Sequence, residues 1–162
     1  MRDRRLDEIE AIYRLRYPAF LRVAAAIVGD EDLGADAIQD GFAGVVRSRR
    51  RFRGGSLDAW VWAAVVNAAR STRRRSAGFE LAAVEVVSPT VDEHPRAAPL
   101  RQAIANLPER QRLVVFLHYF ADLDYRAIAT VVGIRPGTVG ATLNAARAAL
   151  HKALIQEDAC IK

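Results

Sequence analysis

Two clusters of arginine are the side chains in this sequence best suited to binding chemistry. Five of the seven residues from 47 to 53 are arginine, and Arg70 is followed by three more at positions 73–75. Guanidinium groups donate paired hydrogen bonds to phosphate, and aromatic rings can stack on unpaired bases. An arginine cluster is often only a solvated helix end. Two clusters on either side of a tryptophan-containing helix favour phosphate contact instead.

Residues for other kinds of chemistry are missing from the sequence. It contains no paired carboxylates, no nucleophile beside a base and no phosphate-cradling glycine loop, so we expect no enzyme and no small-molecule substrate. His118 is interpreted as a core or boundary residue, because His94 and His151 are remote in sequence and no cysteine pairs with them. We therefore expect no metal and no cofactor.

Composition limits the class of protein. The 162 residues are 51% hydrophobic, and strand-type alternation is scarce, which predicts an all-α protein. The net charge of +5 favours an anionic partner, nucleic acid more readily than membrane. The longest apolar run, residues 60–66, is far shorter than the ~20 residues of a membrane span. The sequence also has no signal peptide and one cysteine, so we expect a cytoplasmic, nucleoid-associated protein without membrane insertion.

Charge and proline content divide the chain into three segments. Residues 1–75 carry 15 basic and 10 acidic side chains, residues 76–99 carry 1 and 4, and residues 100–162 carry 8 and 5. The middle segment has three of the six prolines and no helical period, which is typical of a linker. We predict two small helical domains, residues 1–75 and 100–162, joined by a flexible linker that allows packed and extended arrangements. Residues 81–87 of the linker are a candidate docking segment.

Four helices are expected in the first domain. Pro18 is predicted to end one helix, and a second follows over residues 20–28. The acidic run at residues 30–32 should cap a third helix that turns Phe42 inward, because carboxylates favour the positive end of a helix. Ser56 is the expected cap of a fourth helix over residues 58–75, after a hinge at residues 54–55. This last helix begins with two tryptophans that cannot share one face.

The tryptophans, Trp60 and Trp62, therefore have different expected roles. We assign Trp60 to the core. Trp62 is then the candidate for contact with DNA.

Residues 124–150 have the pattern of a helix-turn-helix. Tyr125 and Ile128 begin one buried apolar face, Gly133 is a C-cap, and Pro136 suits the first turn of a second helix. Either Asp122 or Asp124 would cap the first helix. A second helix of this kind commonly enters the DNA major groove, although a plain helical hairpin remains the alternative.

Nearly the whole chain outside the linker resembles bacterial sigma factors of the extracytoplasmic-function type, in the sigma-70 family. The segment LPERQRLVVFLHYFADLDYRAIATVVGIRPGTV is similar to their region 4. DEDLGADAIQDGF resembles the acidic helix of region 2, and FRGGSLDAWVWAAVVNAARSTRRR resembles the segment that follows. The resemblance implies a region 2-like helical bundle and a region 4-like helix-turn-helix domain. It also implies promoter recognition, −10 melting and transcription initiation without catalysis.

The resemblance further implies partners and their contact residues. The partners are core RNA polymerase, through its clamp and flap, promoter DNA and an anti-sigma factor. Residues implied to bind core polymerase are Asp36, Gln39, Asp40 and Phe42. Residues implied to bind the −10 element are Arg51, Phe52, Arg53, Ser56, Trp62, Asn67, Arg70, Arg73 and Arg74. Residues implied to bind the −35 element are Arg135, Thr138, Thr142, Asn144, Arg147 and Lys152.

The second helix of the helix-turn-helix departs from the family pattern. The family has GTVKSRL where this chain has GTVGATL, followed by AAR instead of RAR. Fewer cations mean fewer phosphate contacts, so we expect the second domain alone to bind DNA weakly. The alternative function is a sigma-like module that binds polymerase, an anti-sigma factor or itself without initiating. The preserved arginines of the first domain favour initiation.

Overall fold

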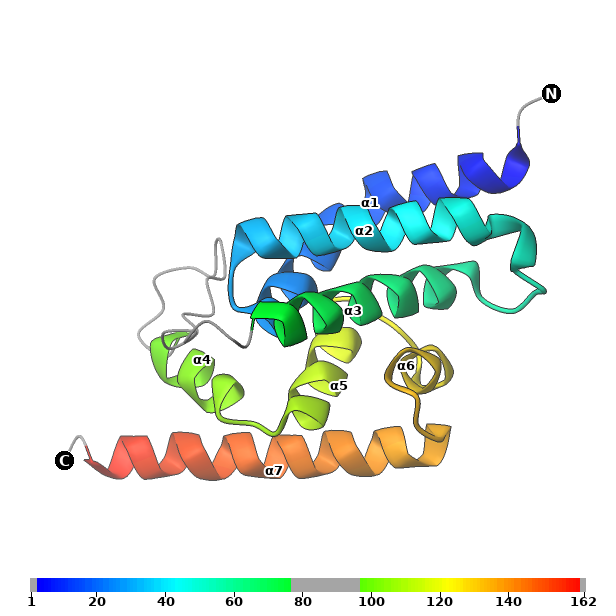
Figure 1. Cartoon of the computed structure of the whole chain (residues 1–162). Helices are drawn as coiled ribbons and strands as arrows, with labels where there is room; N and C mark the ends of the chain where they lie inside the picture. Colours follow the sequence, from blue (N-terminus) through cyan, green and yellow to red (C-terminus); the bar gives the residue numbers. More distant parts are fainter. Residues whose placement is uncertain (1–2, 77–96, 161–162) are drawn as a thin grey trace.

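The computed structural model describes residues 3–76 and 97–160, in which every regular element is a helix and there is no strand (Figure 1). The all-α prediction is therefore confirmed. The elements in chain order are α1 (Arg4–Val28), α2 (Glu31–Ser48), the 3₁₀ helix η1 (Arg49–Arg51), α3 (Leu57–Ser76), α4 (Ala97–Ala105), α5 (Glu109–Tyr119), α6 (Tyr125–Val132) and α7 (Pro136–Cys160). Helices α1, α2 and α3 pack together as one bundle. Helix α7 runs along the opposite side, with α4, α5 and α6 between (Figure 1).

Aromatic rings fill the centre of the N-terminal bundle. The ring of Phe20 lies 4.1 Å from that of Trp62 and meets Phe42 edge-on at 5.2 Å. Tyr13 meets the other side of Phe42 at 4.9 Å. Helix α2 approaches α3 closely at Gly41, where an added Cβ would lie 2.9 Å from the Val65 Cα. These contacts fix α3, and with it the second arginine cluster, on a rigid support.

Pro18 does not end a helix, so the prediction of two helices before residue 29 is wrong. Helix α1 continues through Pro18 from Arg4 to Val28. A proline removes one backbone hydrogen bond, but Ile9 before it and Phe20 and Val23 after it are all buried. The continuous apolar face packs against α2 and α3 and outweighs the lost bond. The predicted acidic cap is confirmed, and Asp30 is its capping residue, since the Asp30 carboxylate accepts from the Leu33 amide at 2.8 Å.

The two tryptophans have the opposite roles to those predicted. Trp62 is fully buried against Phe20, whereas Trp60 is only partly buried. The reason is the rotation of α3, because Trp62 shares its face with the buried Ala69 and Val66 at three- and four-residue spacing. Trp60 shares a face with the exposed Asn67 instead. Trp62 is therefore excluded as a DNA contact.

The predicted helix-turn-helix is present in the C-terminal half. Asp124, not Asp122, caps α6 by accepting from the Ala127 amide at 2.7 Å. Gly133 ends α6 in a left-handed conformation, and Pro136 is the first residue of α7. Tyr125 was expected to be buried but is 41% exposed, because α6 turns Ile128 and Ala129 toward the core instead. Helix α7 also continues beyond the predicted limit at residue 150.

The N- and C-terminal halves contact each other directly. Helix α6 packs against α3, and α1 against α5. Arg16 of α1 donates to the Ala121 carbonyl and pairs with Asp58 of α3 at 3.4 Å. Burial raises the pKa of Asp58, with Arg16 opposing the shift. Helix α4 begins at Ala97, inside the predicted linker, whereas the candidate docking segment 81–87 lies outside the described residues. Within the described part, no helix is long and apolar enough to cross a membrane.

Candidate nucleic-acid interface

The first arginine cluster occupies η1 and the loop between α2 and α3. Gly54 and Gly55 both have positive φ angles, 114° and 92°, as expected for the predicted hinge. Ser56 then caps α3, because its hydroxyl accepts from the Ala59 amide at 3.1 Å. Arg51 and Arg53 are exposed on this loop. The cap and the hinge together hold two cations at the surface beside the start of α3.

A groove separates this loop from α6. It has a volume of about 640 Å³ and is lined on one side by residues 51–56, Ala59 and Trp60. The rings of Phe52 and Trp60 lie 5.3 Å apart on that side. Arg126 and Thr130 of α6 are on the other side. The groove combines guanidinium groups with aromatic rings, the pairing that suits a phosphate joined to an unstacked base.

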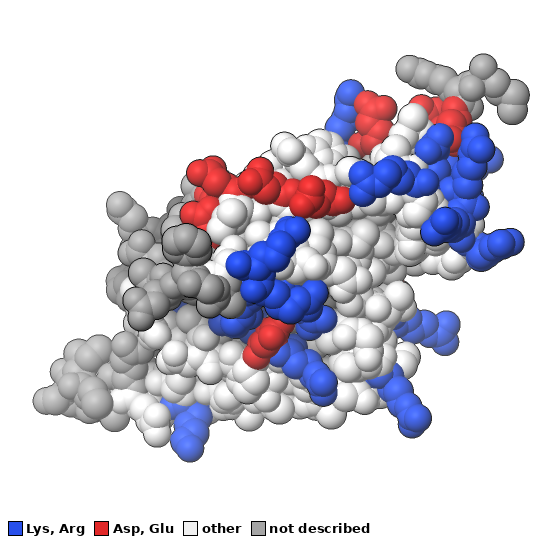
Figure 2. Space-filling model, viewed as in Figure 1, with Lys and Arg blue, Asp and Glu red and all other residues white. Residues whose placement is uncertain are grey.

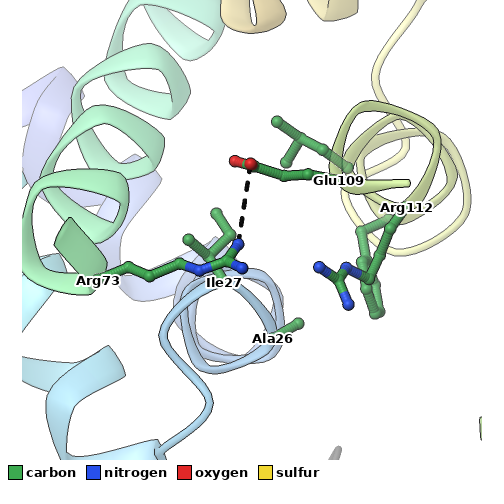
Figure 3. A pocket seen from close by; sticks show the side chains of 7 residues that line it. Ala26, Ile27, Arg73, Glu109 and Arg112 are labelled. Carbon is green, nitrogen blue, oxygen red and sulfur yellow. Dashed lines mark ion pairs between the residues drawn. The ribbon is translucent and has the colours of Figure 1, made fainter. Parts of the chain in front are cut away.

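The second arginine cluster lies on the last turns of α3. Asn67 and Arg74 are exposed there, whereas Arg70 and Arg73 face the start of α5. The Arg70 Nε lies 3.3 Å from the Glu109 Oε1, and the Arg73 Nη1 lies 3.8 Å from the Oε2. Figure 3 shows Arg73 and Glu109 facing each other across this junction. Two of the predicted DNA contacts are thus paired with a carboxylate of the other half.

A third guanidinium stands near this pair. Arg112, one turn after Glu109, lines the same small cavity as Arg73 (Figure 3). Burial lowers the pKa of Arg112, the like charge of Arg73 lowers it further, and Glu109 opposes both. The Arg112 Nη1 donates to the Ala105 carbonyl at 2.9 Å. The single Glu109 carboxylate therefore lies near three cations, Arg70, Arg73 and Arg112, and the cluster keeps an excess of positive charge.

The acidic face of α2 lies beside these basic surfaces. Figure 2 shows a stripe of acidic side chains along α2 that meets basic side chains where α2 passes into η1. Asp36, Gln39 and Asp40 are exposed on this face. Phe42 is only 7% exposed and packs between Tyr13 and Phe20. Its predicted contact with a partner is therefore corrected, because its ring belongs to the bundle core.

The predicted −35 residues occupy the turn before α7 and the exposed surface of α7. Arg135, Thr138, Asn144, Arg147 and Lys152 are exposed, and Thr142 is half-buried. Val139, Leu143 and Ala146 form the buried stripe opposite. Helical spacing puts the two threonines on one edge, and Asn144 with Arg147 on the other. Between these edges lie the exposed alanines at 141, 145 and 148, and Lys152 continues the same row one turn later. The first turns of this row therefore offer no charged group for phosphate contact.

One of these side chains has a partner that the sequence did not suggest. The Arg147 Nε donates to the Tyr119 hydroxyl at 2.9 Å, and its guanidinium carbon lies 5.7 Å from the centre of that ring. Tyr119, Trp60 and Glu109 were all missed as site residues. The signal for Trp60 was its position on the same helix face as Asn67. Glu109 and Tyr119 had no such local signal, since their partners are distant in sequence.

The described residues contain no group of three or more acidic, histidine or cysteine side chains that could hold a metal. His118 is half-buried between Tyr119 and Tyr125, with rings at 4.8 and 5.9 Å. It therefore has the boundary position expected for it.

Comparison with known proteins finds two family matches, which cover consecutive parts of the chain. The family described as Sigma-70 region 2 matches residues 12–78, and Sigma-70, region 4 matches residues 97–150. RNA polymerase sigma-H factor of Pseudomonas aeruginosa is 30% identical, covering 83% of this chain and 79% of its own length. RNA polymerase sigma factor SigV of Bacillus subtilis is 24% identical, covering 86% of each. The fold is similar to that of RpoE from Bartonella quintana, solved with the anti-sigma factor NepR (TM-score 0.74, 21% identity, 91% and 96% coverage).

Proposed function

The chain belongs to the sigma-70 family as an RNA polymerase sigma factor of the extracytoplasmic-function type, and we propose that it directs promoter recognition, −10 opening and transcription initiation. One observation carries this proposal. Both sigma-70 regions occur in order in a single chain, and the first region presents two arginine clusters beside an exposed acidic helix. The expected partners are core polymerase and promoter DNA, which the chain would meet at the nucleoid in the cytoplasm.

The −10 element would be held by the loop and by the end of α3. Arg51, Arg53 and Arg74 are exposed and free to approach phosphates. The Phe52 and Trp60 rings offer a stacking surface for an extruded base. Stacking and phosphate contacts together offset the cost of unstacking that base, a few kcal/mol. Asn67 and Ser56 stand at the edges of this surface, where they can read or position the strand.

Core polymerase would contact the acidic face of α2. Asp36, Gln39 and Asp40 form a polar, negatively charged strip on a rigid helix. Charge complementarity of this kind steers association and fixes its register. Phe42 supports the strip from the core and makes no contact of its own.

The −35 element would be held less firmly. Arg135 and Arg147 are the exposed arginines of the turn and α7, and Thr138 and Asn144 are the polar groups best placed for base edges. The alanines between them favour the second candidate function, a sigma-like module that binds a protein partner such as an anti-sigma factor. The exposed arginine clusters of the first half favour initiation.

Transcription with purified core polymerase separates these two functions. We expect the full chain to direct transcripts from defined start sites on genomic templates, and Arg74→Gln to weaken them. Arg14→Gln is the matched control, because Arg14 is also exposed but pairs with Glu10 on α1. A chain that binds polymerase yet produces no specific transcript would instead be an interaction module.

A further inference from the structure

The contact between Glu109 and the arginines of α3 suggests a role for the carboxylate beyond folding. Glu109 presents one oxygen to Arg70 and the other to Arg73, as a DNA phosphate would present two of its oxygens. We propose that Glu109 is an internal competitor of the DNA backbone, which occupies these two arginines while the halves are packed together. This inference rests on the proposed binding of DNA by α3.

The geometry indicates that the ion pairs of Glu109 with Arg70 and Arg73 are weak enough for a phosphate to replace the carboxylate. The Arg70 Nε–H has no hydrogen-bond partner although the carboxylate is close, so the contact is an ion pair of poor alignment. The Glu109 side chain is 48% exposed, which lets water and salt weaken the pair. A single negative charge also faces three guanidinium groups, because Arg112 joins Arg70 and Arg73. A phosphate-rich strand would satisfy the exposed members of this cluster better.

The cavity at the junction is too small for a second anion. It lies among Arg73, Glu109 and Arg112 and has a volume of about 10 Å³, room for no more than one water molecule. A phosphate therefore has no room inside this cavity, and one that approaches from the solvent side competes with Glu109 for the guanidinium groups of Arg70 and Arg73. Loss of the Glu109 contact removes one of the ties between α5 and α3. Opening of the halves would thus release Arg70 and Arg73, whereas Arg51, Arg53 and Arg74 are already exposed in the packed arrangement.

Other contacts between the halves do not depend on Glu109. Arg16 still bonds to the Ala121 carbonyl, and α6 still packs on α3. Loss of the carboxylate should therefore shift the balance toward the open arrangement without removing the closed one. Glu109 is the first residue of α5, so its removal also affects the helix dipole. Glu31, the first residue of α2, is the matched control because it has the same helical position and makes no ion pair among the described residues.

The test measures binding of the full chain to a fluorescein-labelled, mixed-sequence single-stranded oligonucleotide by anisotropy. We expect Glu109→Gln to tighten binding by about threefold to tenfold, and Glu31→Gln by less than about twofold. In an Arg70→Gln/Arg73→Gln background, Glu109→Gln should have no effect. Small-angle X-ray scattering should show a larger radius of gyration for Glu109→Gln than for Glu31→Gln.

The outcomes distinguish this inference from the proposed function. Equal tightening by both glutamine variants would overturn it, because net charge would then explain the gain. An unchanged radius together with unchanged affinity would overturn it as well. If no variant binds the oligonucleotide but Glu109→Gln alone expands, the closed contact is supported and DNA binding by α3 is refuted.

Discussion

The N- and C-terminal halves of this sigma factor place their cations differently. In the first half, arginines stand on a loop and a helix end that are held by a core of stacked aromatic rings. In the second, the helix-turn-helix has its caps and buried stripe, but the exposed surface of α7 is largely alanine. The buried stripe determines the fold and the exposed surface determines the contacts. A helix-turn-helix can therefore keep its geometry while its capacity for phosphate contact declines.

The comparison predicts that the first half depends most strongly on its aromatic core. Trp62→Ala should lower the free energy of unfolding by about 3–5 kcal/mol, because it leaves a cavity beside Phe20. Trp60→Ala should cost about 1 kcal/mol or less, since its ring is partly exposed. Urea unfolding followed by circular dichroism measures both changes. Equal losses would contradict the assignment of the two tryptophans.

Trp60 should matter for DNA rather than for folding. Trp60→Ala should weaken binding of a single-stranded oligonucleotide by about 1–3 kcal/mol if one base stacks there. Anisotropy of the folded variant measures the change, and Tyr125→Ala, an exposed aromatic of the other half, is the control.

Neutralising arginines should affect the halves unequally. In Arg70→Gln/Arg73→Gln/Arg74→Gln, the plot of log binding constant against log salt concentration for promoter DNA should be less steep by about 2–3. The same variant should give no specific transcripts. Arg135→Gln/Arg147→Gln should lower the slope by about 1–2 and leave reduced transcription. Filter binding across a salt series provides the slopes. Initiation that survives the triple substitution would refute the role given to the first half.

Restoring a cation to α7 should reduce the difference between the halves. A Cβ at Gly140 would meet only the Tyr125 ring, at 3.5 Å, so a side chain fits. Gly140→Ala should stabilise the chain by about 1 kcal/mol, because glycine is unfavourable inside a helix. Gly140→Lys should in addition tighten DNA binding through one further phosphate contact. If alanine and lysine tighten binding equally, the missing charge is not what limits α7.

At the junction of the halves we expect a smaller effect, a pH dependence of stability that comes from Asp58. Burial raises the folded-state pKa of Asp58 above 3.8, so the native state holds this proton more firmly than the unfolded chain. The protonated Asp58 carboxyl therefore adds to the free energy of unfolding at low pH, and this contribution is lost as pH rises through the folded-state pKa. Asp58→Asn should therefore gain stability relative to the wild type between pH 3.8 and neutrality. Thermal unfolding of both proteins across this range measures the difference, and the opposite trend would contradict the burial of Asp58.

Local signals in the sequence predicted most of the helices and their ends. Asp30, Ser56 and Gly133 act on backbone groups within four residues, so their caps could be assigned without knowledge of the fold. The buried stripe of the helix-turn-helix was equally local, since 3.6 residues per turn fixes which side chains share a face. Composition and net charge likewise predicted an all-helical protein with an anionic partner.

Tertiary packing decided what local signals could not. Pro18 remains inside α1, and Trp62 rather than Trp60 enters the core, because burial against α2 and α3 outweighs the preference of any single residue. Glu109 meets Arg70 only because α5 packs beside α3, and the spacing of these residues in the sequence does not predict that contact. Contacts between residues distant in sequence depend on the summed burial of whole helices. The sequence by itself thus determined which side chains could bind a phosphate, and the packing of the two halves determined which of them already face a carboxylate.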